Sequence, residues 1–146
     1  MNIGIEKINT HEGIMVKVLL DSGTTGMFID KRTAAKHGLR LQKLERPIMV
    51  RNVDGTNNSG GAITHQVKVN VYNKGHMERM SMDVCNLGKT EVMLGMLWLQ
   101  AHNLEINWET GEVKMTRCPV LCGRTKPRKA EKGKRIIMLE EEKIVR

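Results

Sequence analysis

Aromatic side chains are scarce in this sequence, which has one Phe, one Tyr and two Trp among 146 residues. So few rings exclude the aromatic platform on which many nucleic-acid-binding folds stack unpaired bases. The apolar volume comes instead from Val, Ile, Leu and eleven Met residues. Branched aliphatic side chains suit a pleated, half-buried sheet, so the composition favours a core rich in β-strands.

Cysteine is also sparse, and its three copies are too few for the disulfide framework of a small secreted domain. Cys118 and Cys122 lie close together in the sequence, but no second pair and no His cluster completes a zinc site. We therefore expect no metal and no other cofactor. Cys85 lies in an apolar stretch and is expected to be a buried thiol.

Long apolar runs are missing as well. None approaches the roughly 20 residues that a helix needs to cross a bilayer, and no signal-peptide pattern precedes the first strand-like run. We therefore expect no membrane partner and a reducing, intracellular, cytoplasmic location.

The net charge of +8 is unevenly distributed along the chain. Residues 1–116 hold 14 Lys and Arg against 12 Asp and Glu, whereas residues 117–146 hold 10 against 4. Pro and Gly residues also interrupt the second segment, as they do where a compact body ends. We predict one domain over residues 1–116 and a basic C-terminal tail or linker over residues 117–146. Such a tail is either a solvated linker or a segment that binds nucleic acid through its phosphates.

Hydrophobic patterning predicts a small, mostly antiparallel β protein with two short helices. Strands are expected over residues 14–20, 27–29, 46–52, 63–72, 76–85 and 91–94, with a further hairpin over 104–115. One helix is expected over residues 30–38, with Asp30 as its N-cap and Gly38 at its end, and another over 96–102. Residues 1–12 are polar and form either a strand or a loose arm.

The stretch LLDSGTTG, residues 19–26, carries the most information about chemistry. An Asp-Ser-Gly triplet directly after a buried apolar strand suits an aspartic protease, because the strand fixes the backbone from which the Asp21 carboxylate projects. Gly23 lets another backbone approach closely, and the Ser22 hydroxyl can lock the loop against its counterpart. The alternative is a strand-ending turn in which Asp21 and Ser22 cap backbone N–H groups.

A second segment, VMLGMLWL at residues 92–99, strengthens the first interpretation. It resembles a lobe of the pepsin-like architecture, in which an apolar strand ending in Gly crosses under the strand that carries the Asp loop. Val92, Leu94 and Trp98 are core residues on either interpretation. The order and spacing of the motifs therefore favour the protease.

Residues 14–116 resemble the protease of gypsy-class LTR retrotransposons. The pieces that carry the resemblance are DSGTTGMFID, RPIMVRNVDGT with ITHQVKVNV, VMLGMLWLQAHNLEINWETGEV, and RCP. The chain is more distantly similar to the retropepsin-like domain of the ubiquitin-shuttle proteases. The resemblance implies an all-β, retropepsin-like closed barrel with one or two short helices. It also implies a homodimer that cleaves a Gag-Pol-type polyprotein inside a retroelement particle.

The resemblance also assigns residues. Asp21 falls on the catalytic position, and Ser22, Gly23 and Thr24 fall on the active-site loop. The flap, which binds the substrate, falls on the segment from Asn52 to Ile63. The residues of this segment that are expected to bind substrate are Asn52, Val53, Asp54, Gly55 and Ile63.

Two positions depart from the viral pattern. Thr24 stands where viral retropepsins usually carry Ala, which makes the floor of the site bulkier. Gly95 is followed by Met96 in place of Arg, so the ion pair that supports the viral dimer cannot form in the same way. The hairpin over residues 104–115 is expected to build the subunit interface instead.

Only one of the four Asp residues lies in an Asp-Ser-Gly context, so one chain cannot make the site and two copies of Asp21 can. The competing hypothesis is a catalytically silent retropepsin-fold module that dimerises or binds peptides. Nucleic-acid binding by the basic tail is compatible with both. The five His residues have no Ser or Cys nucleophile context and are interpreted as surface or satisfied core residues.

Overall fold

The computed structural model describes residues 1–50, 61–73 and 75–118, together with the backbone of residues 123 and 124. Within these residues the strands are β1 (Asn2–Lys7), β2 (Gly13–Leu20), β3 (Met27–Asp30), β4 (Gln42–Ile48), β5 (Ile63–Asn73), β6 (His76–Cys85), β7 (Val92–Leu94), β8 (Glu105–Asn107), β9 (Glu112–Lys114) and β10 (Gly123–Arg124). The helices are α1 (Lys31–Lys36) and α2 (Met96–His102). The predicted all-β class with two short helices is confirmed.

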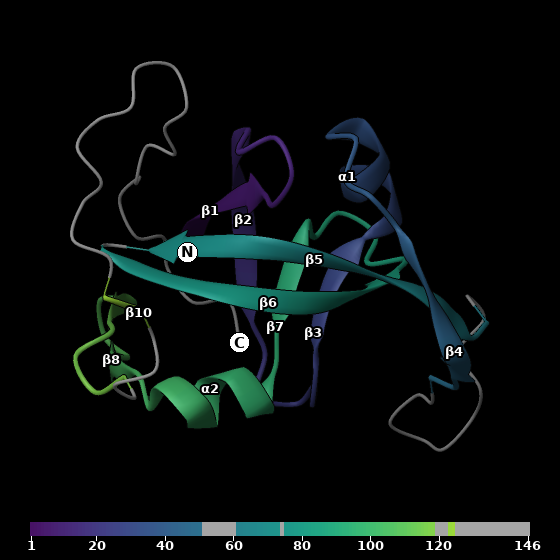
Figure 1. Cartoon of the computed structure of the whole chain (residues 1–146). Helices are drawn as coiled ribbons and strands as arrows, with labels where there is room; N and C mark the ends of the chain where they lie inside the picture. The colour runs from purple at the N-terminus through teal and green to yellow at the C-terminus, as the bar shows by residue number, and fades with distance from the viewer. Residues whose placement is uncertain (51–60, 74, 119–122, 125–146) are drawn as a thin grey trace.

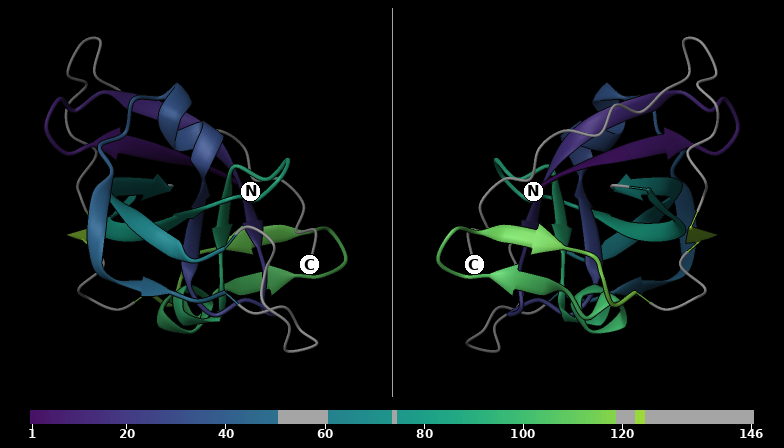
Figure 2. Two further views of the ribbon diagram at one scale, coloured as in Figure 1. Left: turned by 90° about the vertical axis from the view of Figure 1, so that its right-hand side faces the viewer. Right: turned by 90° about the vertical axis from the view of Figure 1, so that its left-hand side faces the viewer.

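Six strands close into a barrel in the order β6, β3, β7, β2, β1 and β5, and the long β5–β6 hairpin completes the ring. β4 and β10 lie outside the ring, paired to β5 and β6 respectively. In Figure 1 the two long strands cross in front of β7 and β3, α1 lies at one end of the barrel and α2 at the other. Figure 2 shows that β8 and β9 form a separate small hairpin beside α2.

The N-terminal segment, for which a strand and a loose arm were both open, contains a strand of the barrel, β1. β1 pairs antiparallel with both β2 and β5. Ile3 and Ile5 are fully buried by this arrangement. Full burial of such a side chain contributes about 1.5–3 kcal/mol, which is enough to hold a short strand in place.

The alternation in β5 is confirmed, because Val67, Val69 and Val71 all lie in the core. Asn70, from the polar half of the pattern, is buried too. Its amide donates to Oε1 of the buried Glu6 at 3.3 Å, and polar groups are stable in an interior when they are hydrogen-bonded in this way. Strict alternation therefore does not separate core from surface at this point of the barrel.

β4 differs from its predicted bounds. The strand was expected over residues 46–52 but begins at Gln42 and ends at Ile48, and residues 51–52 lie outside the described part of the chain. Its pairing with β5 shifts register between Lys43 and Ile48. Pro47 has no N–H for a ladder, and proline is tolerated on an irregular edge strand of this kind.

Both helices form where they were predicted. The Asp30 side chain caps α1 by accepting from the Arg32 N–H, and Gly38 follows the helix with a positive φ of 63°. α2 begins after Gly95 and ends at Asn103, which adopts the left-handed conformation that closes many helices. Within the described residues, neither helix is long and apolar enough to cross a membrane.

Contacts continue past residue 116. The Arg117 guanidinium donates to the carbonyl oxygens of Asn103 and Leu104, each at 2.8 Å. β10 pairs with the first residues of β6. The boundary between residues 116 and 117 stays a prediction.

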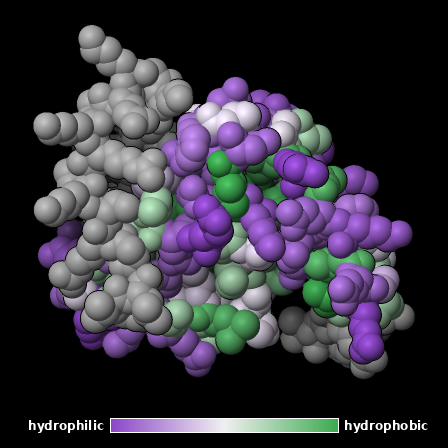
Figure 3. Space-filling view, viewed as in Figure 1, coloured by the Kyte–Doolittle hydropathy of each residue, from purple (hydrophilic) through white to green (hydrophobic). Residues whose placement is uncertain are grey.

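The face shown in Figure 3 is largely hydrophilic, with separate hydrophobic patches. Five large hydrophobic side chains are exposed within the described residues: Leu41, Ile48, Met49, Leu97 and Trp108. Trp108, in the turn of the β8–β9 hairpin, is 73% exposed.

Candidate active site

Asp21 lies at the point where β2 ends and the chain turns out of the barrel. Its N–H donates to the carbonyl oxygen of Leu94 at 3.0 Å, which extends the parallel β2–β7 pairing by one step. The residue is only 5% exposed although it carries a carboxylate. A buried carboxylate needs hydrogen-bond donors, and the loop that follows provides them.

Two donors from that loop hold the carboxylate. The Gly23 N–H donates to Oδ1 of Asp21 at 2.9 Å, and the Thr24 hydroxyl donates to Oδ2 at 3.1 Å. The Thr24 hydroxyl also lies 3.4 Å from the sulfur of Met93, on the neighbouring strand β7. Each carboxylate oxygen is thereby fixed, so the group has one orientation.

The turn between β7 and α2 holds this loop in place through backbone hydrogen bonds. The N–H groups of Gly95, Met96 and Leu97 donate in turn to the carbonyl oxygens of Gly26, Thr24 and Thr25, at 2.8, 2.6 and 3.0 Å. A Cβ atom on Gly95 would lie 2.5 Å from the Gly26 carbonyl oxygen and closer still to that of Thr24. Glycine is therefore required where the two segments cross, which fits the resemblance of residues 92–99 to a strand that ends in Gly under the Asp loop.

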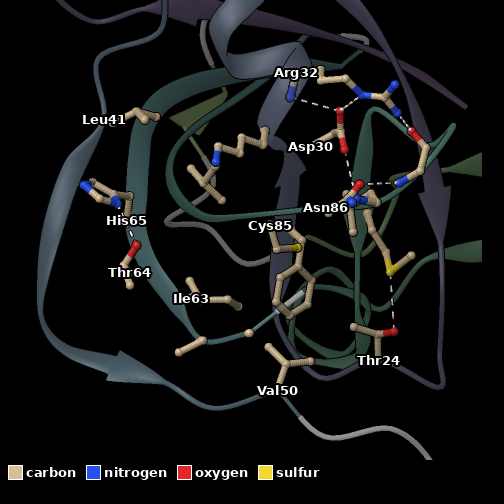
Figure 4. Close-up of a pocket in the computed structure, with 18 residues that line it drawn as sticks. Thr24, Asp30, Arg32, Leu41, Val50, Ile63, Thr64, His65, Cys85 and Asn86 are labelled. Carbon is tan, nitrogen blue, oxygen red and sulfur yellow. Dashed lines mark hydrogen bonds and ion pairs between the residues drawn. The ribbon is translucent and has the colours of Figure 1, made fainter. Parts of the chain in front are cut away.

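A groove of about 980 Å³ follows β3, the start of β5 and the segment after β6. Thr24 of the Asp21 loop lines it, whereas Asp21 itself does not. Figure 4 shows its lining, with Thr24 at one end and Leu41 and His65 at the other. Phe28, Ile63, Val84 and Met93 provide its apolar surface, and Asp30, Lys31 and Arg32 its charged rim. Such a mixture of apolar walls and polar groups is found in binding sites.

Asp30 stiffens one wall of the groove. Its Oδ2 accepts from the Arg32 N–H at 3.1 Å, and its Oδ1 accepts from the Leu87 N–H at 2.9 Å. The Arg32 guanidinium in turn donates to the carbonyl oxygen of Gly88 at 2.7 Å. One carboxylate therefore joins the start of α1 to the segment that follows β6.

Cys85, the thiol expected to be buried, is partly buried in the same wall. Burial raises its pKa to about 11, and the carboxylates of Asp83 and Asp30 add to the effect. A thiol in such surroundings stays protonated at neutral pH, so its role is packing.

The residues assigned from the sequence are only partly brought together. Asp21, Ser22, Gly23 and Thr24 form the loop described above, with Ser22 exposed. Ile63 is buried and lines the groove. The flap residues Asn52, Val53, Asp54 and Gly55 lie outside the described part of the chain.

Met93 and Asp30 were not assigned to the site from the sequence. Met93 had been counted only as part of an apolar strand, and Asp30 only as a helix cap. The sequence does contain a signal for Met93. Side chains alternate along a strand, so a strand that pairs with the end of β2 places some of its side chains beside the Asp21 loop. Within the described residues, no group of three or more His, Cys, Asp and Glu side chains is arranged to hold a metal ion.

Comparisons with known proteins agree with this geometry. The family model described as the PEG10/RTL1 protease domain matches residues 17–122. The crystal structure of the retroviral protease-like domain of Ddi1 from Leishmania major superimposes with a TM-score of 0.51 at 19% sequence identity. That match covers 80% of this chain and 87% of the other. At this identity it shows the fold, which is retropepsin-like.

Proposed function

The chain belongs to the PEG10/RTL1 protease domain family, and from that membership we propose that it is an aspartic endopeptidase that acts as a homodimer. The single observation that carries the proposal is the Asp21 carboxylate. It is nearly buried at the end of a barrel strand, and a glycine N–H and a threonine hydroxyl fix its two oxygens. A catalytic group has to be held in this way before substrate arrives.

The described residues of one chain supply a single carboxylate with this geometry. Asp30 is engaged in capping α1 and holding the segment after β6. Asp83 lies on β6, where it pairs across the sheet with Gln66 and Phe28. The second carboxylate that an aspartic protease needs therefore comes from Asp21 of a second copy.

The chemistry follows from bringing the two Asp21 side chains together across a twofold axis. In aspartic proteases as a class, two carboxylates about 3 Å apart cannot both ionise, so the pair holds one proton and titrates as a unit. The ionised member takes a proton from a water molecule, and the resulting hydroxide attacks the scissile carbonyl carbon. The protonated member donates its hydrogen bond to the carbonyl oxygen as negative charge develops there.

The substrate class is a polypeptide in extended conformation. The groove between β3 and the start of β5 has apolar walls for side chains, and an extended peptide bound there would form main-chain hydrogen bonds with strand edges. The proposed substrate is a Gag-Pol-type polyprotein, and membership in a protease domain family supports this proposal.

The dimer surface is assigned to the end of the molecule that carries α2 and the β8–β9 hairpin. Leu97 and Trp108 are the exposed hydrophobic side chains there. Met96 follows Gly95 in place of the Arg whose ion pair supports viral dimers. Apolar contacts of the hairpin replace that ion pair.

Cleavage of a hydrophobic peptide library over a range of protein concentrations tests the proposal. Asp21→Asn should abolish cleavage, because the amide cannot act as a base, and should leave the dimer intact in sedimentation experiments. Glu12→Gln, which makes the same chemical change at an exposed turn, is the matched control and should cleave normally. Cleavage by Asp21→Asn, or wild-type activity per chain that stays constant on dilution to monomer, would overturn the proposal.

A second candidate is a catalytically silent module that dimerises or binds peptides. Met96 in place of Arg favours it, because a weaker dimer loses turnover without any change at Asp21. It predicts that wild type and Asp21→Asn bind library peptides equally and cleave none. The basic tail is a separate candidate for nucleic-acid binding, and it predicts an affinity for RNA that falls steeply with salt and survives removal of residues 1–116.

A further inference from the structure

Three side chains far apart in the sequence meet at the end of α2. His102, on the last turn of the helix, is 2% exposed. Its Nδ1 lies 3.2 Å from the sulfur of Cys118, and its Nε2 lies 2.5 Å from Oε2 of Glu78 on β6. This is a thiol, an imidazole and a carboxylate in line, and none of the three belongs to the Asp21 site.

We propose that Cys118, His102 and Glu78 form a reactive-thiol site at which the domain is reversibly modified by small disulfides such as oxidised glutathione. The proposal is independent of protease activity, because it invokes none of the residues of the Asp21 loop or the groove. From the sequence, His102 was interpreted as a surface or satisfied core residue, whereas here it is proposed to act as a base.

The hydrogen-bond geometry sets the direction of proton transfer. A carboxylate only accepts hydrogen bonds, so the Nε2 of His102 that faces Glu78 carries the hydrogen. In the neutral ring, Nδ1 then presents its lone pair to Cys118. The ring can take the thiol proton there, and the Glu78 carboxylate stabilises the positive charge that results. This is the general pattern of an activated nucleophile.

Trp98 holds the arrangement in place. Its indole N–H donates to Oε1 of Glu78 at 3.2 Å, and its ring lies against that of His102 with centroids 4.4 Å apart. Both oxygens of the Glu78 carboxylate are thus engaged by residues of α2. The imidazole cannot turn away from Cys118 without breaking these contacts.

The other ionisable groups near this point are engaged elsewhere within the described residues. The Arg117 guanidinium is turned to the carbonyl oxygens of Asn103 and Leu104. Nε2 of His76, on β6, lies 3.0 Å from the Met115 carbonyl oxygen. The Glu105 carboxylate accepts from the Thr116 hydroxyl at 2.9 Å. His102 is therefore the base that contacts the thiol.

Cys85 provides an internal contrast. It is partly buried, as Cys118 is, but carboxylates and not a histidine face it, and its pKa is raised to about 11. The two thiols should therefore differ in reactivity for reasons of electrostatics and not of exposure alone. One chain thus contains both the site and its control.

The reaction balances without a further oxidant. The Cys118 thiolate attacks one sulfur of the small disulfide, a new S–S bond forms, and the original S–S bond breaks. The departing thiolate takes the proton that His102 had received. One thiol and one mixed disulfide result, and a reducing thiol reverses the exchange.

Alkylation by iodoacetamide over a pH series tests the site in the full chain, with fragment-ion mass spectrometry to tell Cys118 from Cys122 and from Cys85. Cys118 should react at least tenfold faster than Cys85 at pH 7. Its alkylation rate should reach half of its maximum below about pH 8.5, which is the ordinary pKa of a free thiol. Glu78→Gln keeps the shape of the side chain and should move that midpoint to higher pH. Glu105→Gln, a nearby carboxylate outside the site, should leave it unmoved.

Exposure to oxidised glutathione supplies the second readout. A mass gain of one glutathione that fragment ions place on Cys118 and not on Cys122, lost again on reduction and slowed in Glu78→Gln, supports the proposal. His102→Ala should abolish the effect, and Glu78→Gln covers the case in which that larger change unfolds the protein. Equal alkylation rates for Cys118 and Cys85, or a pH profile that Glu78→Gln leaves unchanged, would overturn it.

Discussion

The hydroxyl of Thr24 donates a hydrogen bond to Oδ2 of Asp21 at 3.1 Å, and its oxygen also lies 3.4 Å from the sulfur of Met93. The extra bulk that the sequence predicted beside the catalytic position is therefore a donor aimed at the carboxylate. The acceptor is almost closed to solvent, since Asp21 is only 5% exposed. This hydrogen bond is the contact of the site that mutagenesis can remove most cleanly.

Thr24→Val should lower peptide cleavage, because valine keeps the branched shape and removes the donor that orients Asp21. The free energy of unfolding should fall by about 1–3 kcal/mol, the cost of leaving a buried acceptor without its partner. Thr24→Ser retains the hydroxyl and is the matched control, with cleavage close to wild type. Equal cleavage by the Val and Ser variants would show that the hydroxyl plays no part in positioning.

Gly95→Ala should destabilise the fold and abolish activity, because its Cβ would collide with the carbonyl oxygens of Thr24 and Gly26. Backbone on both sides cannot move aside cheaply, so we expect a loss of about 1–3 kcal/mol or more in chemical denaturation. Gly75→Ala is the comparison, since its Cβ meets nothing within 4 Å and its cost comes only from a positive φ of 82°. A smaller loss for Gly95→Ala than for Gly75→Ala would contradict the close crossing.

Asp83→Asn should stabilise the protein at neutral pH. Burial raises the pKa of the Asp83 carboxyl, so its folded-state pKa lies above the unfolded value and the ionised group disfavours folding. That penalty disappears as the pH falls through the folded pKa, because the carboxyl is then protonated in the folded state. Urea denaturation should therefore give a larger free energy of unfolding for Asp83→Asn at pH 7, and a difference that shrinks towards pH 3.

The same variant carries a second readout. The Asp83 carboxylate adds to burial in raising the pKa of the Cys85 thiol. Asp83→Asn should therefore speed alkylation of Cys85 at a fixed alkaline pH. A stability difference that is independent of pH, together with an unchanged Cys85 rate, would show that the carboxylate is not desolvated.

Deletion of residues 117–146 should leave a folded β body, because the barrel strands all lie before residue 86 or within 92–94. The deletion removes the two hydrogen bonds of the Arg117 guanidinium, so a loss of about 1–3 kcal/mol is expected. Deletion of residues 125–146 alone should retain that contribution. Loss of cooperative thermal unfolding in the chain that lacks residues 117–146 would refute a domain boundary at residue 116.

Much of the barrel could be predicted from the sequence, because its information is local. The alternation of Val67, Val69 and Val71, the turn before β6 and the capping side chain of Asp30 each act within a few residues. The Asp21 loop could be predicted for the same reason, since a short motif after an apolar strand defines it.

What could not be predicted depends on contacts between distant segments. Residues 1–12 have an ambiguous pattern, and β1 becomes a strand only because β2 and β5 lie on both sides of it. β4 begins four residues before its predicted start, at Gln42, because pairing with β5 decides where the strand starts. The meeting of His102 with Cys118 and Glu78 has no local signal, because the three residues come from α2, the segment after β9 and β6, which only the fold brings together.

The closure of the barrel has a kinetic consequence. Val18 pairs with Val92, and the backbone of Lys17 is hydrogen-bonded to Glu91, 74 residues further along the chain. Contacts of such long range carry a large loop-closure entropy before they return any stabilisation, and they are associated with folding in milliseconds to seconds. During synthesis the ring can therefore form only after β7 has left the ribosome, and the strands β1 to β6 are exposed to chaperones and to aggregation until then.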